Sequence, residues 1–211
     1  MRTRSAALLA LLTVLAAAPA AAQRTSVGAS YDWSLPMGDL KTYSDNDSWL
    51  GFTMDIRTQG SSNKVTFGGL FGYYEFYNML ASGSGTTVLP RGAVSGQQYH
   101  HVFSLPIMLN ATYWTGSGAY GKPRLFLGLN AGVTYLKQTT DIGIYSTIND
   151  AWVVAAMPEL GIALPTTGHT QMNLHVRYHI PFSSTSLYSG GTSGASMQYL
   201  AIGVGFNDRM F

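Results

Sequence analysis

Eight stretches of this chain alternate, with a period of two, between apolar residues and small or polar residues. In one of them Leu174, Val176 and Tyr178 share one side, and His175 and Arg177 share the other. Such alternation places successive side chains on opposite faces of a β-strand. The stretches are residues 25–35, 50–58, 64–75, 98–113, 124–137, 151–164, 171–180 and 197–206. A closed antiparallel barrel needs an even number of strands, so we predict an all-β fold, an eight-stranded antiparallel up-and-down transmembrane β-barrel.

The composition favours a membrane barrel over a soluble one. Charged residues make up 10% of the chain, against a usual share of about 25%. A soluble lipocalin-like barrel, the structural alternative, would enclose an apolar cavity and carry charges outside. Here the less apolar face is mostly Gly, Ser, Thr and Asn, too poor in Lys and Glu for an ordinary soluble surface. The sequence contains no cysteine, so no disulfide and no Cys-based metal or redox site is expected.

The N-terminal residues have the pattern of a secretory signal peptide. Arg2 and Arg4 precede an apolar run over residues 6–18, and small residues end the segment at Ala22. This run is shorter than the roughly 20 residues of a helical membrane span. We predict a signal peptide over residues 1–22 that is cleaved after Ala22, and a barrel domain over 23–211. Without the two leader arginines, 10 Lys and Arg balance 10 Asp and Glu, so charge does not support a nucleic-acid partner.

The expected connections between strands alternate in length. Long connections are predicted at 36–48, 77–97, 138–150 and 181–196, and shorter ones at 59–63, 115–122 and 165–169. Outer-membrane barrels have short periplasmic turns and longer extracellular loops. We therefore place both termini and the shorter connections on the periplasmic side.

Large aromatic residues recur on the apolar face near the expected extracellular end of seven of the eight strands. Rings of Trp and Tyr at this height mark the level of the lipid headgroups. The alternative is that β-strands are simply rich in aromatic residues. We predict an aromatic girdle formed by Trp33, Phe52, Tyr73, Tyr99, Tyr135, Trp152 and Tyr178.

The opposite face collects ionisable residues, which would point into the lumen of the barrel. They are Asp32, Asp55, Arg57, His100, Glu159, His175, Arg177 and His179. Charges inside a narrow barrel must pair with one another or with water. From this set we predict a lumenal ion cluster formed by Asp55, Arg57, Glu159, His175 and Arg177. Because eight strands leave a lumen just wide enough for side chains, structural filling is favoured over a gate or a hydrolytic site.

The pairing within this cluster depends on the register of one hairpin. Symmetric closure of the connection 165–169 would place Glu159 opposite His175 and diagonal to Arg177. A slip of two residues would keep the faces unchanged and place Glu159 opposite Arg177 instead. Either register gives the carboxylate a cationic neighbour.

The mature sequence resembles the small bacterial outer-membrane β-barrel family of the OmpA/OmpX kind. The resemblance is carried by the strand pattern, the first-loop segment 36–41, the Gly-rich final strand 199–206 and the terminal Phe211. It implies export to the outer membrane of a Gram-negative-type bacterium. The implied partners are membrane lipid, lipopolysaccharide, the outer-membrane assembly machinery and an unidentified ligand of the extracellular loops. A terminal aromatic residue resembles the signal read by that machinery, and either Phe206 or Phe211 could supply it.

The sequence offers no motif for catalysis. It lacks a G-x-S-x-G nucleophile elbow, a phosphate-binding glycine loop and a metal-ligand motif, and no cofactor is expected. His101 is expected to face outward, but no serine and carboxylate can be placed beside it. We therefore predict a non-enzymatic protein with an envelope-structural role or a role in loop-mediated binding. The alternatives are a lipid A-modifying outer-membrane enzyme and a narrow porin-like channel.

Overall fold

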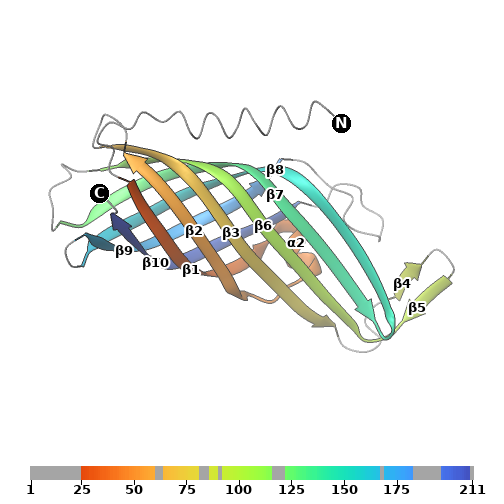
Figure 1. Cartoon of the computed structure of the whole chain (residues 1–211). Helices are drawn as coiled ribbons and strands as arrows, with labels where there is room; N and C mark the ends of the chain where they lie inside the picture. The colour runs from red at the N-terminus through yellow and green to blue at the C-terminus, as the bar shows by residue number, and fades with distance from the viewer. Residues whose placement is uncertain are drawn as a thin grey trace, which may run out of the picture.

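Eight long strands close into a single antiparallel barrel in the computed structural model (Figure 1). The structure describes residues 25–59, 64–80, 86–89, 92–115, 122–166, 169–182 and 196–209. The predicted signal peptide and Phe211 lie outside these residues. The barrel strands are β1 (Thr25–Met37), β2 (Ser48–Gln59), β3 (Val65–Leu80), β6 (Gln98–Trp114), β7 (Arg124–Ile142), β8 (Tyr145–Pro165), β9 (Thr170–Pro181) and β10 (Met197–Arg209).

The strand order around the barrel is β1-β10-β9-β8-β7-β6-β3-β2. Each strand therefore pairs with its neighbours in sequence, and the pairing of β1 with β10 closes the ring, with Ser26 opposite Arg209. Closure leaves no open edge along the wall, which a β-structure needs in order to cross hydrocarbon. This is the predicted up-and-down fold. The beginning of β1 and the end of β10 lie at the same end of the barrel.

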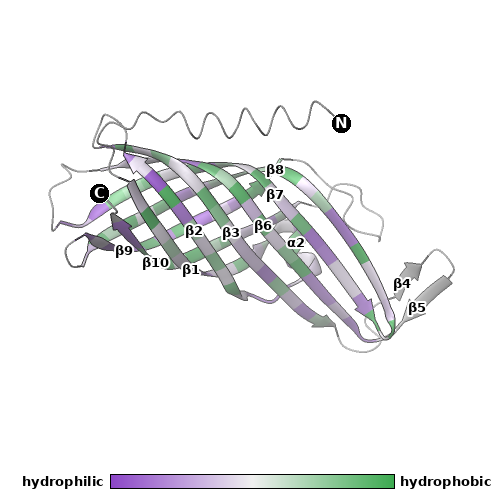
Figure 2. Cartoon of the chain, in the orientation of Figure 1, coloured by the Kyte–Doolittle hydropathy of each residue, from purple (hydrophilic) through white to green (hydrophobic). Residues whose placement is uncertain are grey.

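The period-two alternation separates lipid-facing from lumen-facing residues. On β7, Leu125, Leu127 and Leu129 are each more than half exposed on the outer face, whereas Phe126 and Asn130 are buried inside. Figure 2 shows hydrophobic residues along the middle of the strands and hydrophilic residues toward the far ends of β7 and β8. A lipid-facing belt of this kind is the expected outer surface of a membrane barrel, not of a soluble one.

One predicted loop is wrong. Residues 138–150 continue β7 and β8, which are joined by a tight turn at Gly143 and Ile144. Gly143 has a φ of 59°, a conformation that glycine adopts without the strain of a side chain. The outward positions of β7 here, such as Thr139 and Asp141, are polar because the strand runs beyond the apolar belt. The hydropathy signal for a strand therefore disappears although the strands continue.

Two further elements lie at the same end of the molecule. A short helix, α2 (Gly38–Tyr43), follows β1 within the predicted loop 36–48 and buries Leu40 and Tyr43. A small hairpin of β4 (Thr86–Leu89) and β5 (Gly92–Ser95) lies between β3 and β6 in sequence and forms its own two-stranded sheet. Among the described residues, no helix has the length and apolarity needed to cross a membrane.

Candidate functional site

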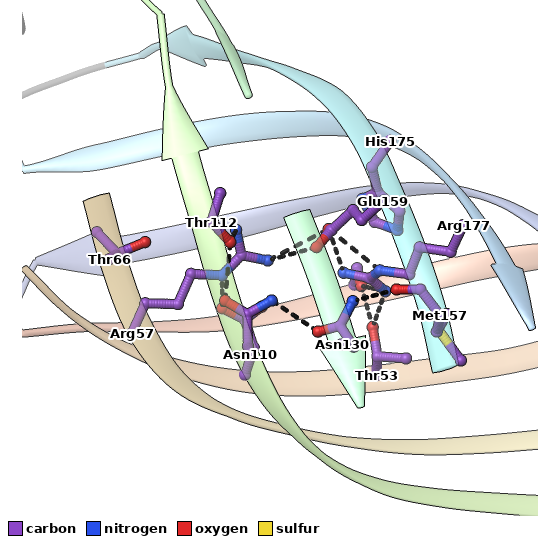
Figure 3. Close-up of polar contacts among 12 residues, drawn as sticks. Thr53, Arg57, Thr66, Asn110, Thr112, Asn130, Met157, Glu159, His175 and Arg177 are labelled. Atoms are coloured by element: carbon purple, nitrogen blue, oxygen red, sulfur yellow. Dashed lines mark hydrogen bonds and ion pairs between the residues drawn. The ribbon is translucent and has the colours of Figure 1, made fainter. Parts of the chain in front are cut away.

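Glu159 is the centre of an ion network inside the barrel (Figure 3). It projects inward from β8 because it shares a face with Met157 and Gly161, and its side chain is fully buried. Arg177 donates to Glu159 Oε1 through Nη2 at 2.9 Å and through Nε at 3.1 Å. Arg57 donates from the opposite wall through Nη2, at 3.2 Å to Oε1 and 3.3 Å to Oε2. One carboxylate therefore binds two guanidinium groups.

The Arg57 branch extends this network along β2 and β6. Arg57 Nε donates to Asp55 Oδ2 at 2.8 Å, and Nη1 donates to Thr112 Oγ1 at 3.4 Å. Thr112 in turn donates to Asn110 Oδ1 at 2.8 Å. The Arg57 guanidinium also lies 5.5 Å from the centre of the Phe126 ring. These contacts hold the guanidinium where the barrel interior excludes water.

The contacts of Arg177 extend the network from β9 to β1 and β2. Arg177 Nη1 donates to Thr53 Oγ1 at 2.7 Å and lies 3.4 Å from Asp32 Oδ2. His175 Nε2 lies 2.7 Å from Asp32 Oδ1, and the Tyr74 hydroxyl donates to Asp32 Oδ2 at 3.1 Å. Asp32 is thus a full member of the network. The parity of its strand position placed it on the lumenal face, but sequence reasoning left it out of the cluster.

A glycine makes the Asp32–His175 contact possible. Gly203 on β10 pairs with Asp32 on one side and with His175 on the other. A Cβ atom at this position would lie 1.9 Å from Asp32 Oδ1 and 2.4 Å from His175 Nε2. Since such distances are far below van der Waals contact, only glycine lets the two side chains meet across the intervening strand.

The charges of the network nearly balance. Asp32, Asp55 and Glu159 supply three carboxylates, Arg57 and Arg177 supply two guanidinium groups, and His175 contacts Asp32. Buried charges are tolerated only when they are paired and hydrogen-bonded. The arrangement therefore braces β1, β2, β8 and β9 against one another and leaves no charged group of the network directed at an open space.

An apolar and aromatic layer fills the lumen between this network and α2. Tyr199 is its centre: its ring lies 4.8 Å from Tyr74, 5.4 Å from Phe76 and 4.6 Å from His179, measured between centroids. Tyr74 and Phe76 have no measurable exposure, and Tyr199 is 1% exposed. Large rings therefore contact one another inside the lumen at this height.

Helix α2 covers the aromatic layer from the loop side. The Tyr43 ring stacks on His100 with a centroid distance of 4.1 Å and an interplanar angle of 3°. The Tyr43 hydroxyl donates to the Thr139 carbonyl at 2.9 Å and contacts Thr140 Oγ1 at 2.7 Å, and His100 Nδ1 lies 2.7 Å from the Tyr43 carbonyl. The first loop therefore folds into the mouth of the barrel and closes it.

The other end of the lumen is closed by Trp114, Phe126 and Ala163, with the Arg124 guanidinium 5.1 Å from the Trp114 ring centre. A polar cavity of about 40 Å³ remains there, lined by residues that include Gln59, Thr66 and Asn207. This volume has room for a few water molecules but is too small for an organic ligand.

The structure brings together all five residues of the predicted ion cluster, but with a different pairing. Glu159 lies opposite Arg177, and His175 lies opposite Gly161. The prediction that Glu159 faces His175 is therefore wrong, and the alternative register, shifted by two residues, is the observed one. Leu164 pairs with Met172 rather than with Thr170, and the same register continues into the hairpin end, where the Thr166 amide donates to the Thr170 carbonyl at 3.3 Å.

The seven residues of the predicted aromatic girdle all lie on the outer face of their strands. Four neighbouring strands carry rings in contact, a set that we call the aromatic row: Tyr73, Phe103, Tyr135 and Trp152, with successive centroid distances of 5.2, 6.1 and 5.3 Å. Phe103 takes the β6 position in this row that the prediction gave to Tyr99, which contacts Tyr77 further along the strand. Trp33 stacks on Trp49 at 5.3 Å, a partner that the sequence did not indicate.

Metal binding has no support in the described part of the chain, where no group of three or more His, Cys, Asp or Glu side chains is arranged to hold an ion.

Comparison with solved structures relates the whole fold to outer-membrane barrels. Neisserial surface protein A matches 89% of this chain and 97% of its own, with a TM-score of 0.52 and 11% identity. Ail, the attachment invasion locus protein of Yersinia pestis, matches 88% of this chain and 98% of its own, with a TM-score of 0.49 and 11% identity. The N-terminal barrel of Pseudomonas aeruginosa OprF covers the same shares, with a TM-score of 0.45 and 13% identity.

No protein-family model matches the sequence, and no curated protein is significantly similar to it. At such low identity the structural likeness defines the fold alone. The resemblance to the OmpA/OmpX kind that the strand pattern indicated is confirmed at that level. This chain is a small eight-stranded transmembrane β-barrel with the fold of the outer-membrane barrel proteins.

Proposed function

We propose that the protein is a non-enzymatic, non-conducting barrel of the outer membrane that presents its extracellular strand ends to an external partner. The observation that carries this proposal is the filled lumen. Successive layers of ion pairs, aromatic rings and the α2 helix occupy it, and the largest fully buried side chains include Arg177, Tyr74 and Tyr199. A pore needs a continuous aqueous path, whereas this interior resembles a protein core.

The extended β7–β8 ribbon supports the binding role. Beyond the aromatic row at Tyr135 and Trp152, these strands continue to their turn through seven residues of β7 and seven of β8, or roughly 23 Å of ribbon at 3.3 Å per residue. At the tip, the side chain of Ile144 is 92% exposed and that of Tyr145 is 50% exposed. These exposed apolar side chains at the tip of a paired ribbon are available to contact another molecule.

The first test is electrical. Reconstituted into planar bilayers, the wild-type protein is expected to give no unitary conductance steps, because Tyr199 and its neighbours block the lumen. Steps that change in Tyr199→Ala but not in Leu200→Ala, its lipid-facing neighbour, would instead support the channel. Lipid A isolated from cells with and without the protein is expected to have the same mass spectrum, and a mass change would support the enzymatic alternative.

The second test determines orientation. Since the wild-type chain has no cysteine, a membrane-impermeant maleimide is expected to label Ile144→Cys on intact cells and to leave the wild type unlabelled. Lys122→Cys, in the connection between β6 and β7 at the other end of the barrel, is expected to react only after the outer membrane is permeabilised. The reverse pattern would place the ribbon in the periplasm and contradict the proposal.

A further inference from the structure

The outer wall of the barrel is hollowed beside the aromatic row, on the side toward the turn between β7 and β8. The groove spans β3, β6 and β7 and has a volume of about 540 Å³. It is lined by Tyr73, Phe103 and Tyr135 and by polar residues further along the same strands. These outward side chains are half-buried, whereas Ile107 and Leu109, further into the belt on β6, are 45% and 61% exposed. The groove therefore covers its side chains more than the lipid-facing wall does.

Glu75 places a carboxylate in apolar surroundings within this groove. Its register partners are Leu50 on β2 and Phe103 on β6, and neither carries a charge. The Tyr73 hydroxyl donates to Glu75 Oε2 at 2.7 Å. A carboxylate can accept about four hydrogen bonds. The phenol therefore leaves the charge of Glu75 and most of its acceptor capacity available to a further donor.

The ammonium group of the groove is balanced from outside it. Lys137 is the only lysine or arginine among the described lining residues, and its register partner on β8 is Asp150. Opposite charges directly across an antiparallel pair attract each other. Asp141, by contrast, lies between Tyr99 on β6 and Ser146 on β8, so neither register partner is a cation. The two carboxylates thus give the groove an excess of negative charge.

Aromatic rings beside carboxylates discriminate between cations. The rings of Tyr73 and Phe103, with centroids 5.2 Å apart in an edge-to-face pair, offer π surfaces next to Glu75. A guanidinium group stacks on such rings and can donate two parallel hydrogen bonds to a carboxylate. It is also more weakly hydrated than an ammonium ion, so it loses less hydration on entering a half-buried site. The lining therefore favours an arginine side chain.

We propose that this groove binds an arginine side chain of the external partner, and that this partner is a polypeptide. The inference rests on the proposed function and gives the partner's chemistry. A volume of about 540 Å³ lies in the range of roughly 300–1,000 Å³ typical of ligand sites, which leaves room for residues that flank the arginine. The strand β7 leads from Lys137 and Asp141 in the groove directly into the turn at exposed Ile144. One polypeptide can therefore contact both the groove and the tip of the ribbon.

The test uses fluorescence anisotropy of dye-labelled peptides with the purified protein in phosphatidylcholine nanodiscs. The probes are the tripeptide amide Leu-Arg-Leu, its citrulline analogue, which has nearly the same shape but no charge, and its lysine analogue. The arginine peptide is expected to bind about tenfold more tightly than the citrulline peptide, a difference of roughly one charge-assisted hydrogen bond. It is also expected to bind more tightly than the lysine peptide, which cannot form the planar two-point contact.

Four variants assign the binding to the groove. Glu75→Gln and Asp141→Asn are each expected to weaken binding of the arginine peptide by about tenfold. Lys137→Gln removes the competing cation and is expected to tighten binding. Asp45→Asn, which removes an exposed carboxylate beside α2 and outside the groove, is the matched control and is expected to bind as the wild type does.

Several outcomes would overturn the proposal. Equal binding of the arginine and citrulline peptides, or equal losses in Glu75→Gln and Asp45→Asn, would exclude a cation site in the groove. Weaker binding by Lys137→Gln would indicate an anionic ligand. Equal binding of the lysine peptide would contradict the choice of guanidinium, and equally tight binding of free spermine would indicate a small polyamine instead of a polypeptide.

Two controls keep the result interpretable. An unchanged mobility shift between unheated and boiled samples in SDS gels verifies that each variant is folded. Failure of the proposed function is distinguished separately, because conductance and maleimide labelling measure it without any peptide. Both faces of a nanodisc are open to the solvent, so peptide binding does not depend on the orientation of the barrel in the cell.

Discussion

Glu159→Gln is expected to lower the free energy of unfolding by about 3–5 kcal/mol, the cost of removing one partner from a buried ion pair. The reason is geometric: the carboxylate accepts from both Arg57 and Arg177, at 3.2 and 2.9 Å. A neutral amide cannot balance two guanidinium groups, and Asp55 and Asp32 are then their remaining carboxylate contacts. Urea unfolding in lipid vesicles, followed by tryptophan fluorescence and gel mobility, measures the change.

The control for this experiment is Glu75→Gln, at the only other glutamate in the chain. Glu75 lies on the outer face and contacts the Tyr73 hydroxyl, so its replacement should change stability by less than about 1 kcal/mol. Equal effects of the two variants would show that Glu159 does not brace the barrel. A stable Glu159→Gln variant that loses conductance or lipid-modifying activity found in the wild type would show instead that the network is functional.

Leu129→Arg and Val176→Arg are expected to destabilise the barrel by about 2–4 kcal/mol each, because a cation near the bilayer midplane lies far from water. Both residues are on the outer face near the middle of the apolar belt, and Leu129 is 54% exposed there. Leu125→Arg, on the same face of β7 but at the end of the belt nearer the chain termini, should cost about 0–1 kcal/mol. Unfolding in vesicles measures all three variants, and equal costs at both depths would contradict the position of the belt.

The strand faces could be predicted from the sequence because lipid imposes a strict rule on alternate positions. Each outward residue within the belt must be apolar, so Leu127, Val133 and Val176 indicate both the strand and its orientation. The same rule explains where prediction failed. Beyond the membrane, Thr139 and Asp141 face water, alternation in hydropathy is lost, and β7 continues on backbone pairing and β-branched residues alone.

The members of the ion network were predictable, but their pairing was not. Alternation determines the face of Glu159, His175 and Arg177, yet registers that differ by two residues give identical faces. The choice between them depends on the turn after Pro165, where the sequence carries no strong turn motif. Contacts across the lumen are harder to predict from the sequence. The approach of Arg57 to Glu159 depends on how the other lumenal side chains pack in the closed barrel.

Helix α2 could not be predicted from the sequence, for a different reason. Its single buried pair, Leu40 and Tyr43, is too short a pattern to indicate an amphipathic helix, and the segment was expected to be a loop. Its position depends on tertiary contacts, above all the stacking of Tyr43 on His100, which is 57 residues away in the sequence. Such a contact exists only after the strands on either side have assembled.

The same reasoning gives the ion network a place in the kinetics of assembly. Arg57 and Glu159 are 102 residues apart, and Asp32 and Arg177 are 145 residues apart, so these pairs form only when β1 and β2 come together with β8 and β9. Contacts between distant segments require most of the loop-closure entropy to be lost first, which places them late in folding. Interactions that form after the transition state mainly slow unfolding. The buried charges are thus expected to lower the unfolding rate of the closed barrel and to leave its folding rate nearly unchanged.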